Sequence, residues 1–178
     1  MEVVSLRFAV VYSSLTGNTK LVAEAIREVM PVGTEIFPVE EAPSPEQFDC
    51  LLIGFWANRG LPADNMREYM EGLRNKKVGI FITLGAYPNS EHADQCIKSA
   101  QALLRDHNDI RATFICQGKV DPELTKRFAN LPPEHPHAMT PERRARHEAA
   151  KSHPDEQDLT MAKDVFRKMR SEILGHKR

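Results

Sequence analysis

The sequence predicts an α/β fold in which an open parallel sheet carries helices on both faces. Four short apolar runs, rich in Val, Ile and Phe, mostly do not alternate with polar residues, and this is typical of strands buried on both faces. Helical patterns lie between these runs, and alternation of strands with helices favours a parallel sheet. The buried runs are Leu6–Tyr12, Leu51–Phe55, Val78–Leu84 and Ala112–Cys116.

The remaining strand and the helices follow from further local signals. The run Thr34–Val39 is less apolar and contains Pro38, which cannot donate to a sheet and therefore predicts an edge strand. The connection Glu40–Gln47 is too short for a full helix, so one crossover is expected to be abbreviated. Apolar residues at helical spacing predict helices over Thr19–Met30, Asp64–Leu73 and Glu91–Asp106, the last with Ser90 as its N-cap.

The C-terminal part of the chain differs in composition from the rest. Residues 119–153 are rich in proline and histidine and hold few large apolar residues. Residues 156–174 regain a continuous apolar helical face, which we expect to pack on the sheet. We therefore predict a single domain over residues 1–178, in which 119–153 is an insertion before a C-terminal helix at 156–174.

Charge and cysteine content exclude several classes of protein. The 24 basic and 25 acidic residues give a net charge of −1, which offers no electrostatic case for nucleic acid. No apolar run approaches the ~20 residues that span a bilayer, and the N-terminus lacks the pattern of a signal peptide. Three cysteines without C-x-x-C spacing favour a reducing compartment. We expect a cytoplasmic protein with neither nucleic acid nor membrane as partner, and its oligomeric state, monomer or dimer, stays open.

The segment Tyr12–Thr19, with the sequence YSSLTGNT, leads from the first strand into the first helix. Unpaired N–H groups and the positive dipole end of a helix N-terminus bind phosphate. Gly17 permits close approach, and the side chains of Ser14, Thr16 and Asn18 add donors. An ordinary helix cap and turn is the alternative. The patterns G-x-x-x-x-G-K-[ST] and G-x-G-x-x-G are absent, which argues against nucleotide triphosphate hydrolysis and Rossmann-type NAD binding.

Two further loops each present one large aromatic residue. Gly54–Gly60 contains Trp56, the only tryptophan, and Thr83–Asn89 contains Tyr87. Ligands of open α/β sheets bind outside the carboxyl ends of the strands, where both loops and the phosphate loop are expected. The three loops together suit a flat apolar cofactor with a phosphate tail. The alternatives are a core or lid position for Trp56 and a turn position for Tyr87.

On these features, residues 6–118 resemble a flavodoxin, and SLTGNT is close to the family's FMN-phosphate loop. The resemblance implies a flavodoxin-like, doubly wound, five-stranded parallel sheet of order 2-1-3-4-5 that binds FMN non-covalently. It also implies which residues contact the phosphate and the isoalloxazine ring. Ser14, Leu15, Thr16, Gly17, Asn18 and Thr19 would hold the phosphate, Trp56, Ala57, Asn58 and Gly60 would border one side of the ring, and Gly85, Ala86 and Tyr87 would border the other.

Three features depart from common flavodoxins. Leu15 stands where many members have glycine or another small residue, and the strongly acidic surface typical of electron-carrier flavodoxins is missing. The tail HPHAMTPERRARHEAAKSHPDEQD resembles a bacterial subgroup of short flavodoxin-domain proteins with a C-terminal extension. That subgroup includes the accessory flavodoxin of bilirubin reductase.

The resemblance implies an electron-transfer protein whose partner is a donor reductase or an acceptor enzyme. No residue stands out as a catalytic acid, so we favour a carrier over a stand-alone enzyme. An FMN-dependent NAD(P)H:quinone-type reductase is one alternative, and a flavin-free scaffold is a second. A guanidinium at Arg59 close to the ring would stabilise the reduced anion, and Gly60 would permit a backbone peptide flip.

The C-terminal segment offers two other candidate sites. Its histidines match no standard zinc spacing and have no cysteine among them, so we expect a solvated loop and no metal site at His135, His137, His147 and His153. Three arginines lie on a helix that we expect to begin at Pro141. They form either an exposed helical face or a docking patch for an acidic redox partner or a second copy, namely Arg143, Arg144 and Arg146.

Overall fold

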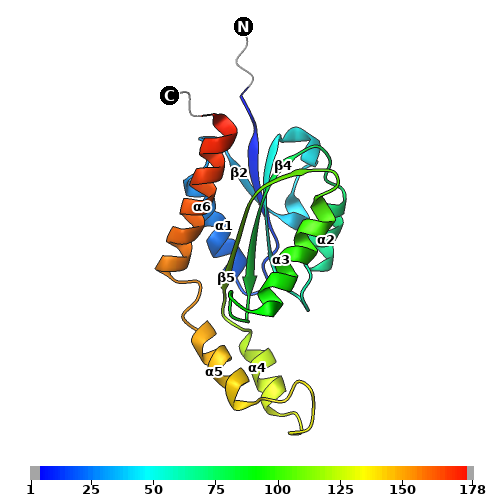
Figure 1. Ribbon diagram of the computed structural model, residues 1–178, viewed down its shortest axis with the longest axis vertical. Coiled ribbons are helices and arrows are strands. Elements are labelled where there is room, and N and C mark those ends of the chain that lie inside the picture. Colours follow the sequence, from blue (N-terminus) through cyan, green and yellow to red (C-terminus); the bar gives the residue numbers. More distant parts are fainter. Residues whose placement is uncertain (1–4, 176–178) are drawn as a thin grey trace.

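The computed structural model describes residues 5–175 and contains one five-stranded parallel sheet (Figure 1). The strand order β2-β1-β3-β4-β5 confirms the predicted fold class. Each apolar run of the sequence forms a strand, and only β5 departs by more than two residues from its predicted bounds. The strands are β1 (Phe8–Tyr12), β2 (Glu35–Pro38), β3 (Cys50–Trp56), β4 (Lys77–Leu84) and β5 (Asp109–Gln117).

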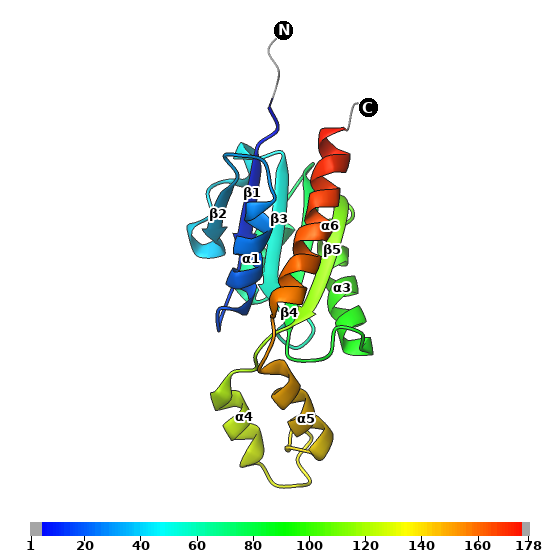
Figure 2. The same ribbon diagram turned by 90° about the vertical axis from the view of Figure 1, so that its left-hand side faces the viewer.

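Two pairs of helices cover the two faces of the sheet. Helices α1 (Asn18–Glu28) and α6 (Glu156–Leu174) pack side by side on one face (Figure 2). Helices α2 (Asp64–Glu71) and α3 (Glu91–Leu104) cover the other. Ser90 caps α3 as predicted, because its hydroxyl accepts from the Ala93 N–H at 3.2 Å. The C-terminal helix α6 therefore covers the same face of the sheet as α1.

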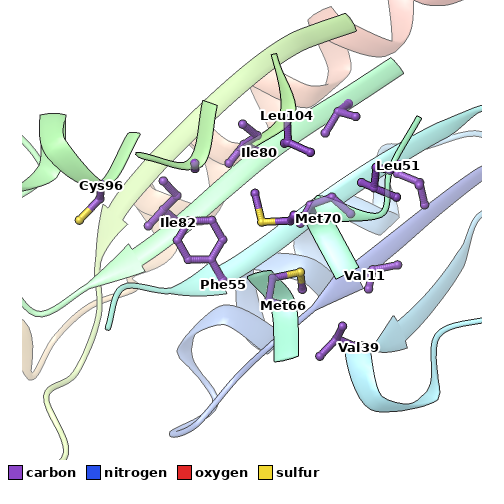
Figure 3. Packing of buried hydrophobic residues seen from close by; sticks show 14 of the residues in the cluster. Val11, Val39, Leu51, Phe55, Met66, Met70, Ile80, Ile82, Cys96 and Leu104 are labelled. Atoms are coloured by element: carbon purple, nitrogen blue, oxygen red, sulfur yellow. The ribbon is translucent and has the colours of Figure 1, made fainter. Parts of the chain in front are cut away.

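The apolar side chains of β3 and β4 are buried on both faces, as their unalternating sequences predict. Figure 3 shows the cluster beneath α2 and α3, where Met66 and Met70 of α2 face the sheet residue Phe55. On the opposite face, Phe166 of α6 lies against Gly79 of β4. A Cβ at Gly79 would stand 2.5 Å from the Phe166 ring, so the glycine makes room for the helix.

The edges of the sheet differ from its centre. Strand β2 ends at Pro38, and two short 3₁₀ turns, Val39–Glu41 and Pro45–Gln47, replace a crossover helix, as predicted. Strand β5 is longer than the predicted 112–116. Its extra residues at the start include Asp109 and Arg111, which pair with each other at 3.0 Å on the exposed edge. Charged residues on an edge strand hide its length from a search for apolar runs.

The insertion, residues 119–153, hangs from the carboxyl edge of the sheet as two helices (Figure 2). Helix α5 (Pro141–Ala150) begins at the predicted proline, but α4 (Pro122–Ala129) contradicts the expectation of a loop. Asp121 caps α4 by accepting from the Glu123 N–H at 2.9 Å. The two ends of the insertion meet where the Lys119 N–H donates to the His153 carbonyl at 3.0 Å.

Candidate functional site

The loop between β1 and α1 has the backbone of an anion-binding turn. Gly17 has a φ of 92°, a left-handed conformation that glycine adopts without strain, and no atom lies within 4 Å of a Cβ built there. The backbone N–H groups of Thr16, Asn18 and Thr19 donate to no atom among residues 5–175. These N–H groups stand at the first turn of α1, where the helix dipole favours negative charge.

The side chains of this loop mainly fix its shape. The Ser14 hydroxyl accepts from the N–H groups of Gly17 (3.1 Å) and Lys20 (3.3 Å). Thr19 is fully buried, and its hydroxyl is 2.8 Å from that of Thr83 at the end of β4. The donors that remain for a ligand are therefore chiefly backbone N–H groups.

A contact with the end of β5 anchors the same loop. The Asn18 amide donates to the Thr16 hydroxyl at 3.1 Å and to the Lys119 carbonyl at 2.9 Å. Gly118 approaches so closely that a Cβ there would stand 2.7 Å from Asn18 Nδ2. The start of the insertion is thus hydrogen-bonded directly to the loop Ser14–Thr19, the predicted phosphate loop.

A cavity of about 610 Å³ lies at the carboxyl edge of the sheet, between the three predicted loops and the insertion. Its size lies within the range of small-molecule sites. It brings together seven of the thirteen predicted site residues, namely Leu15, Thr16, Trp56, Ala57, Gly85, Ala86 and Tyr87. The others do not line the cavity, namely Ser14, Gly17, Asn18, Thr19, Asn58 and Gly60.

A tight turn shapes the rim of the cavity next to Trp56. Asn58 and Leu61 exchange two backbone hydrogen bonds, of 2.8 and 3.0 Å, around a two-residue turn. Both central residues have positive φ, 53° at Arg59 and 82° at Gly60. Positive φ at both positions is the type I′ pattern, which suits glycine but strains a residue such as arginine. The turn directs the Arg59 side chain to the cavity.

The insertion supplies a whole wall of the cavity, although the sequence assigned none of its residues to the site. Phe128 of α4 stacks on His137, with ring centroids 5.7 Å apart, and the Arg143 guanidinium lies 5.8 Å from its ring centre. Two features of the sequence could have revealed α4. Asp121 followed by proline is typical of a helix N-terminus, and Leu124 and Phe128, four residues apart, indicate one apolar helical face. The residues of this wall are Lys119, Val120, Asp121, Leu124, Phe128, His137, Arg143, Arg146 and His147.

His147 contradicts the expectation of a solvated histidine loop. Its side chain lines the cavity, the residue is 8% exposed, and Nδ1 is 2.9 Å from the Thr125 hydroxyl. Burial lowers the pKa of His147, and the positive charges of Arg146 and Arg143 lower it further. His147 is therefore a neutral imidazole near pH 7.

The three arginines of α5 do not form one patch. Arg143 and Arg146 line the cavity, whereas Arg144 lies on the outer side of α5 next to Met139 and Glu148. The guanidinium of Arg143 donates to the carbonyls of Ala138 and Pro136. Only Arg144 therefore has the outward position that a patch for a macromolecular partner requires.

Among the described residues, one group of side chains could hold a metal ion, formed by His153, Asp155 and Asp158. Their ligand atoms lie within 4.8 Å of one another. Asp155 and Asp158 form the capping box of α6, and His153 Nδ1 lies 2.6 Å from Asp158 Oδ2. These contacts explain the cluster as a helix start. Within residues 5–175, no helix has the length and apolarity to cross a membrane.

Comparisons with known proteins agree with this geometry. Residues 9–167 match the family described as Flavodoxin domain. The "Flavodoxin-like domain-containing protein BilS" of Clostridioides difficile (strain CD3) is 32% identical over 161 residues, which cover 86% of this chain and 90% of that protein. Oxidised flavodoxin 1 from Bacillus cereus superposes with a TM-score of 0.61 at 12% identity, over 95% of this chain and 99% of that one. Fusobacterium nucleatum flavodoxin bound to flavin mononucleotide gives 0.60 at 10% identity, over 94% and 99%.

Proposed function

Because the chain belongs to the flavodoxin domain family, we propose that it binds FMN non-covalently in this cavity and exchanges electrons with a partner oxidoreductase. One observation carries the proposal. Among the described residues, the backbone N–H groups of Thr16, Asn18 and Thr19 find no acceptor, and Thr16 itself lines a cavity of about 610 Å³ together with Trp56 and Tyr87. Anion donors next to an aromatic-lined cavity match a molecule with a phosphate at one end and a flat ring at the other.

The chemistry of the residues present fits FMN. The loop Ser14–Thr19 would hold the phosphate through its backbone N–H groups, with Gly17 keeping side-chain atoms away. The segments 56–60 and 85–87 would border the ring. Gln117 supports the second segment, because its buried amide donates to the Gly85 carbonyl at 3.1 Å.

Bound FMN supplies one- and two-electron redox chemistry, and the protein positions and tunes it. Leu15, Trp56 and Tyr87 give this part of the cavity an apolar lining, against which the ring would pack. The cationic side chains of Arg59, Arg143 and Arg146 favour any occupant that gains negative charge, so they would raise its reduction potential. This charge pattern is opposite to that of a strongly acidic carrier.

A pair of matched glycines tests phosphate binding. Gly17 and Gly33 both have positive φ, 92° and 89°, and neither has an atom within 4 Å of a built Cβ. Each glycine-to-alanine change therefore costs a similar ~1 kcal/mol of backbone strain. We expect Gly17→Ala to weaken FMN at least about tenfold and to leave riboflavin unaffected, and Gly33→Ala to spare both ligands. Quenching of Trp56 fluorescence measures the affinities. A wild-type chain that binds neither ligand would instead favour a flavin-free scaffold.

A reductive titration of the FMN-loaded protein tests electron transfer. A carrier takes up two electrons in two separate steps of visible absorbance and oxidises little NAD(P)H on its own. A single two-electron step would exclude a one-electron carrier. The extension of the cavity along the insertion favours the second candidate, an FMN-dependent NAD(P)H:quinone-type reductase, because it offers room for a small acceptor. Steady NAD(P)H turnover with a quinone would support that candidate.

A further inference from the structure

The cavity has a second half that the FMN assignment does not use. Its lining divides by origin into the loops of the sheet, which hold the proposed flavin residues, and the helices of the insertion. Leu124 and Phe128 of α4 give the insertion half an apolar surface, and Val120 extends it toward Gly85, where a Cβ would stand 2.8 Å from the valine. The insertion half is therefore an apolar surface that adjoins the loops proposed to bind the flavin.

Unpaired positive charge faces this cavity. Arg59, Lys119 and Arg146 line it, and their side chains form neither an ion pair nor a hydrogen bond with the part of the chain that the structure describes. Asp121 is the single acidic residue of the lining. Lys119 is the first residue of the insertion, next to the loop Ser14–Thr19, whereas Arg146 belongs to helix α5. Within residues 5–175, Arg146 is thus the cation without a side-chain partner that the helices of the insertion contribute to the lining.

His147 adds a directed hydrogen-bond acceptor beside Arg146. We assign the proton of His147 to Nδ1, because the Thr125 hydroxyl can then donate to the Asp121 carbonyl at 3.4 Å while its oxygen accepts from Nδ1–H at 2.9 Å. Neutral imidazole protonated at Nδ1 keeps a lone pair at Nε2. Nε2 bonds to no described residue, and His147 as a whole residue is 8% exposed and lines the cavity.

We propose that the insertion half of the cavity is a binding subsite for a small, flat, apolar molecule that carries a carboxylate. Arg146 pairs with the carboxylate, Leu124 and Phe128 contact the ring system, and His147 Nε2 accepts an N–H or O–H of the ligand. Arg146 faces the cavity, whereas a segment of a partner protein would meet Arg144 on the outer side of α5, and this favours a small molecule as the occupant. The subsite rests on the proposed function only in that FMN is its neighbour.

Isothermal titration of the FMN-loaded chain with 2-naphthoate and its neutral analogue 2-naphthamide tests the subsite. The two probes share shape and differ in charge. We expect 2-naphthoate to bind at least about tenfold more tightly, because a charge-assisted contact to arginine adds to the same ring burial. Arg146→Met should weaken 2-naphthoate by about tenfold and leave 2-naphthamide unchanged. Arg144→Met is the matched control on the same helix and should keep both affinities within about twofold.

Further variants separate charge from ring contact. Arg146→Lys keeps the charge but not the fork of donors, so an intermediate affinity for 2-naphthoate is expected. Phe128→Ala should weaken both probes alike. Equal binding of the two probes, equal effects of Arg144→Met and Arg146→Met, or no heat of binding to the wild-type chain would overturn the subsite. Visible absorbance reports the FMN content of each sample separately. If the chain takes up no FMN, the proposed function fails, while Arg146-dependent binding of 2-naphthoate to the flavin-free chain still supports the subsite.

Discussion

The sheet and the insertion hold themselves together in different ways. The sheet is packed on both faces by fully buried apolar side chains such as Phe55, Phe81 and Phe166. In the insertion, α4 has no buried residue, and α5 buries only His147 and Ala150. The burial of apolar area therefore stabilises the sheet strongly and the insertion weakly.

Aromatic, imidazole and guanidinium groups take the place of a core in the insertion. Phe128 is surrounded by His137, His147 and Arg143, with ring centroids 5.7 Å and 6.3 Å away and the guanidinium carbon at 5.8 Å. The same groups line the cavity. A segment with little buried apolar area opens locally at low free energy, as ligand-binding elements often do. The insertion is thus organised around the cavity, and the sheet around its own core.

Phe166→Ala should have the largest effect, because it removes a fully buried ring that packs edge-on against Phe81 at 6.1 Å. We expect a loss of about 3–5 kcal/mol in the free energy of unfolding. Urea denaturation measures it. A loss below about 1 kcal/mol would show that α6 contributes little to the core and would remove the contrast between the two regions.

Gly118→Ala should act on the junction of the two regions. Its Cβ would displace the Asn18 amide from the Lys119 carbonyl, at a cost of about 1–3 kcal/mol. Because Asn18 belongs to the proposed phosphate loop, FMN affinity should fall together with stability. Gly72→Ala is the control, since a Cβ at Gly72 meets only ordinary contacts of 3.5 Å or longer. An unchanged FMN affinity in Gly118→Ala would mean that the loop keeps its shape without this anchor.

Phe128→Ala should cost about 1 kcal/mol or less of global stability, since its ring is only partly buried. Its effect should appear locally instead. Hydrogen exchange should speed up at amides of residues 122–150 and stay unchanged in β3 and β4. Faster exchange across the whole sheet would show that the insertion and the core unfold as one unit.

His147 predicts a small pH dependence with a definite sign. Its pKa is lowered in the folded chain from the ordinary value of 6.5, so the unfolded chain takes up the proton first as the pH falls. The contribution of neutral His147 to stability is complete above about pH 6.5 and is lost progressively below it. We expect the free energy of unfolding to fall less between about pH 7 and 5 in His147→Gln than in the wild type. His107→Gln, at the opposite end of the sheet, is the control, and parallel pH profiles of wild type and His147→Gln would contradict the assignment.

Local sequence signals predicted the sheet well and the insertion poorly, for physical reasons. Unbroken apolar runs report two-sided burial directly, so β3 and β4 were located within one residue at each end. Helix α4 carries a recognisable start at Asp121, but the many prolines around it favoured a loop. The different directions of Arg143 and Arg144 could also have been predicted, because side chains of consecutive helical residues point about 100° apart.

The candidate site was predictable only where it rests on the sheet. Strands of known polarity bring Thr16, Trp56 and Tyr87 to one edge, so their proximity follows from topology. The burial of His147 and the inward position of Arg146 depend on how the insertion folds back over that edge. No local pattern encodes that long-range packing.

The backbone bond between Lys119 and His153 makes the insertion a closed excursion from the sheet. Its entry and exit points adjoin, so residues 120–152 could be exchanged for a tight turn, or for another sequence of any length, without moving β5 or α6. The sheet and its helices thus hold the loops that meet the proposed cofactor in place independently of the insertion. Exchange of the insertion alone can therefore change which molecules the protein recognises.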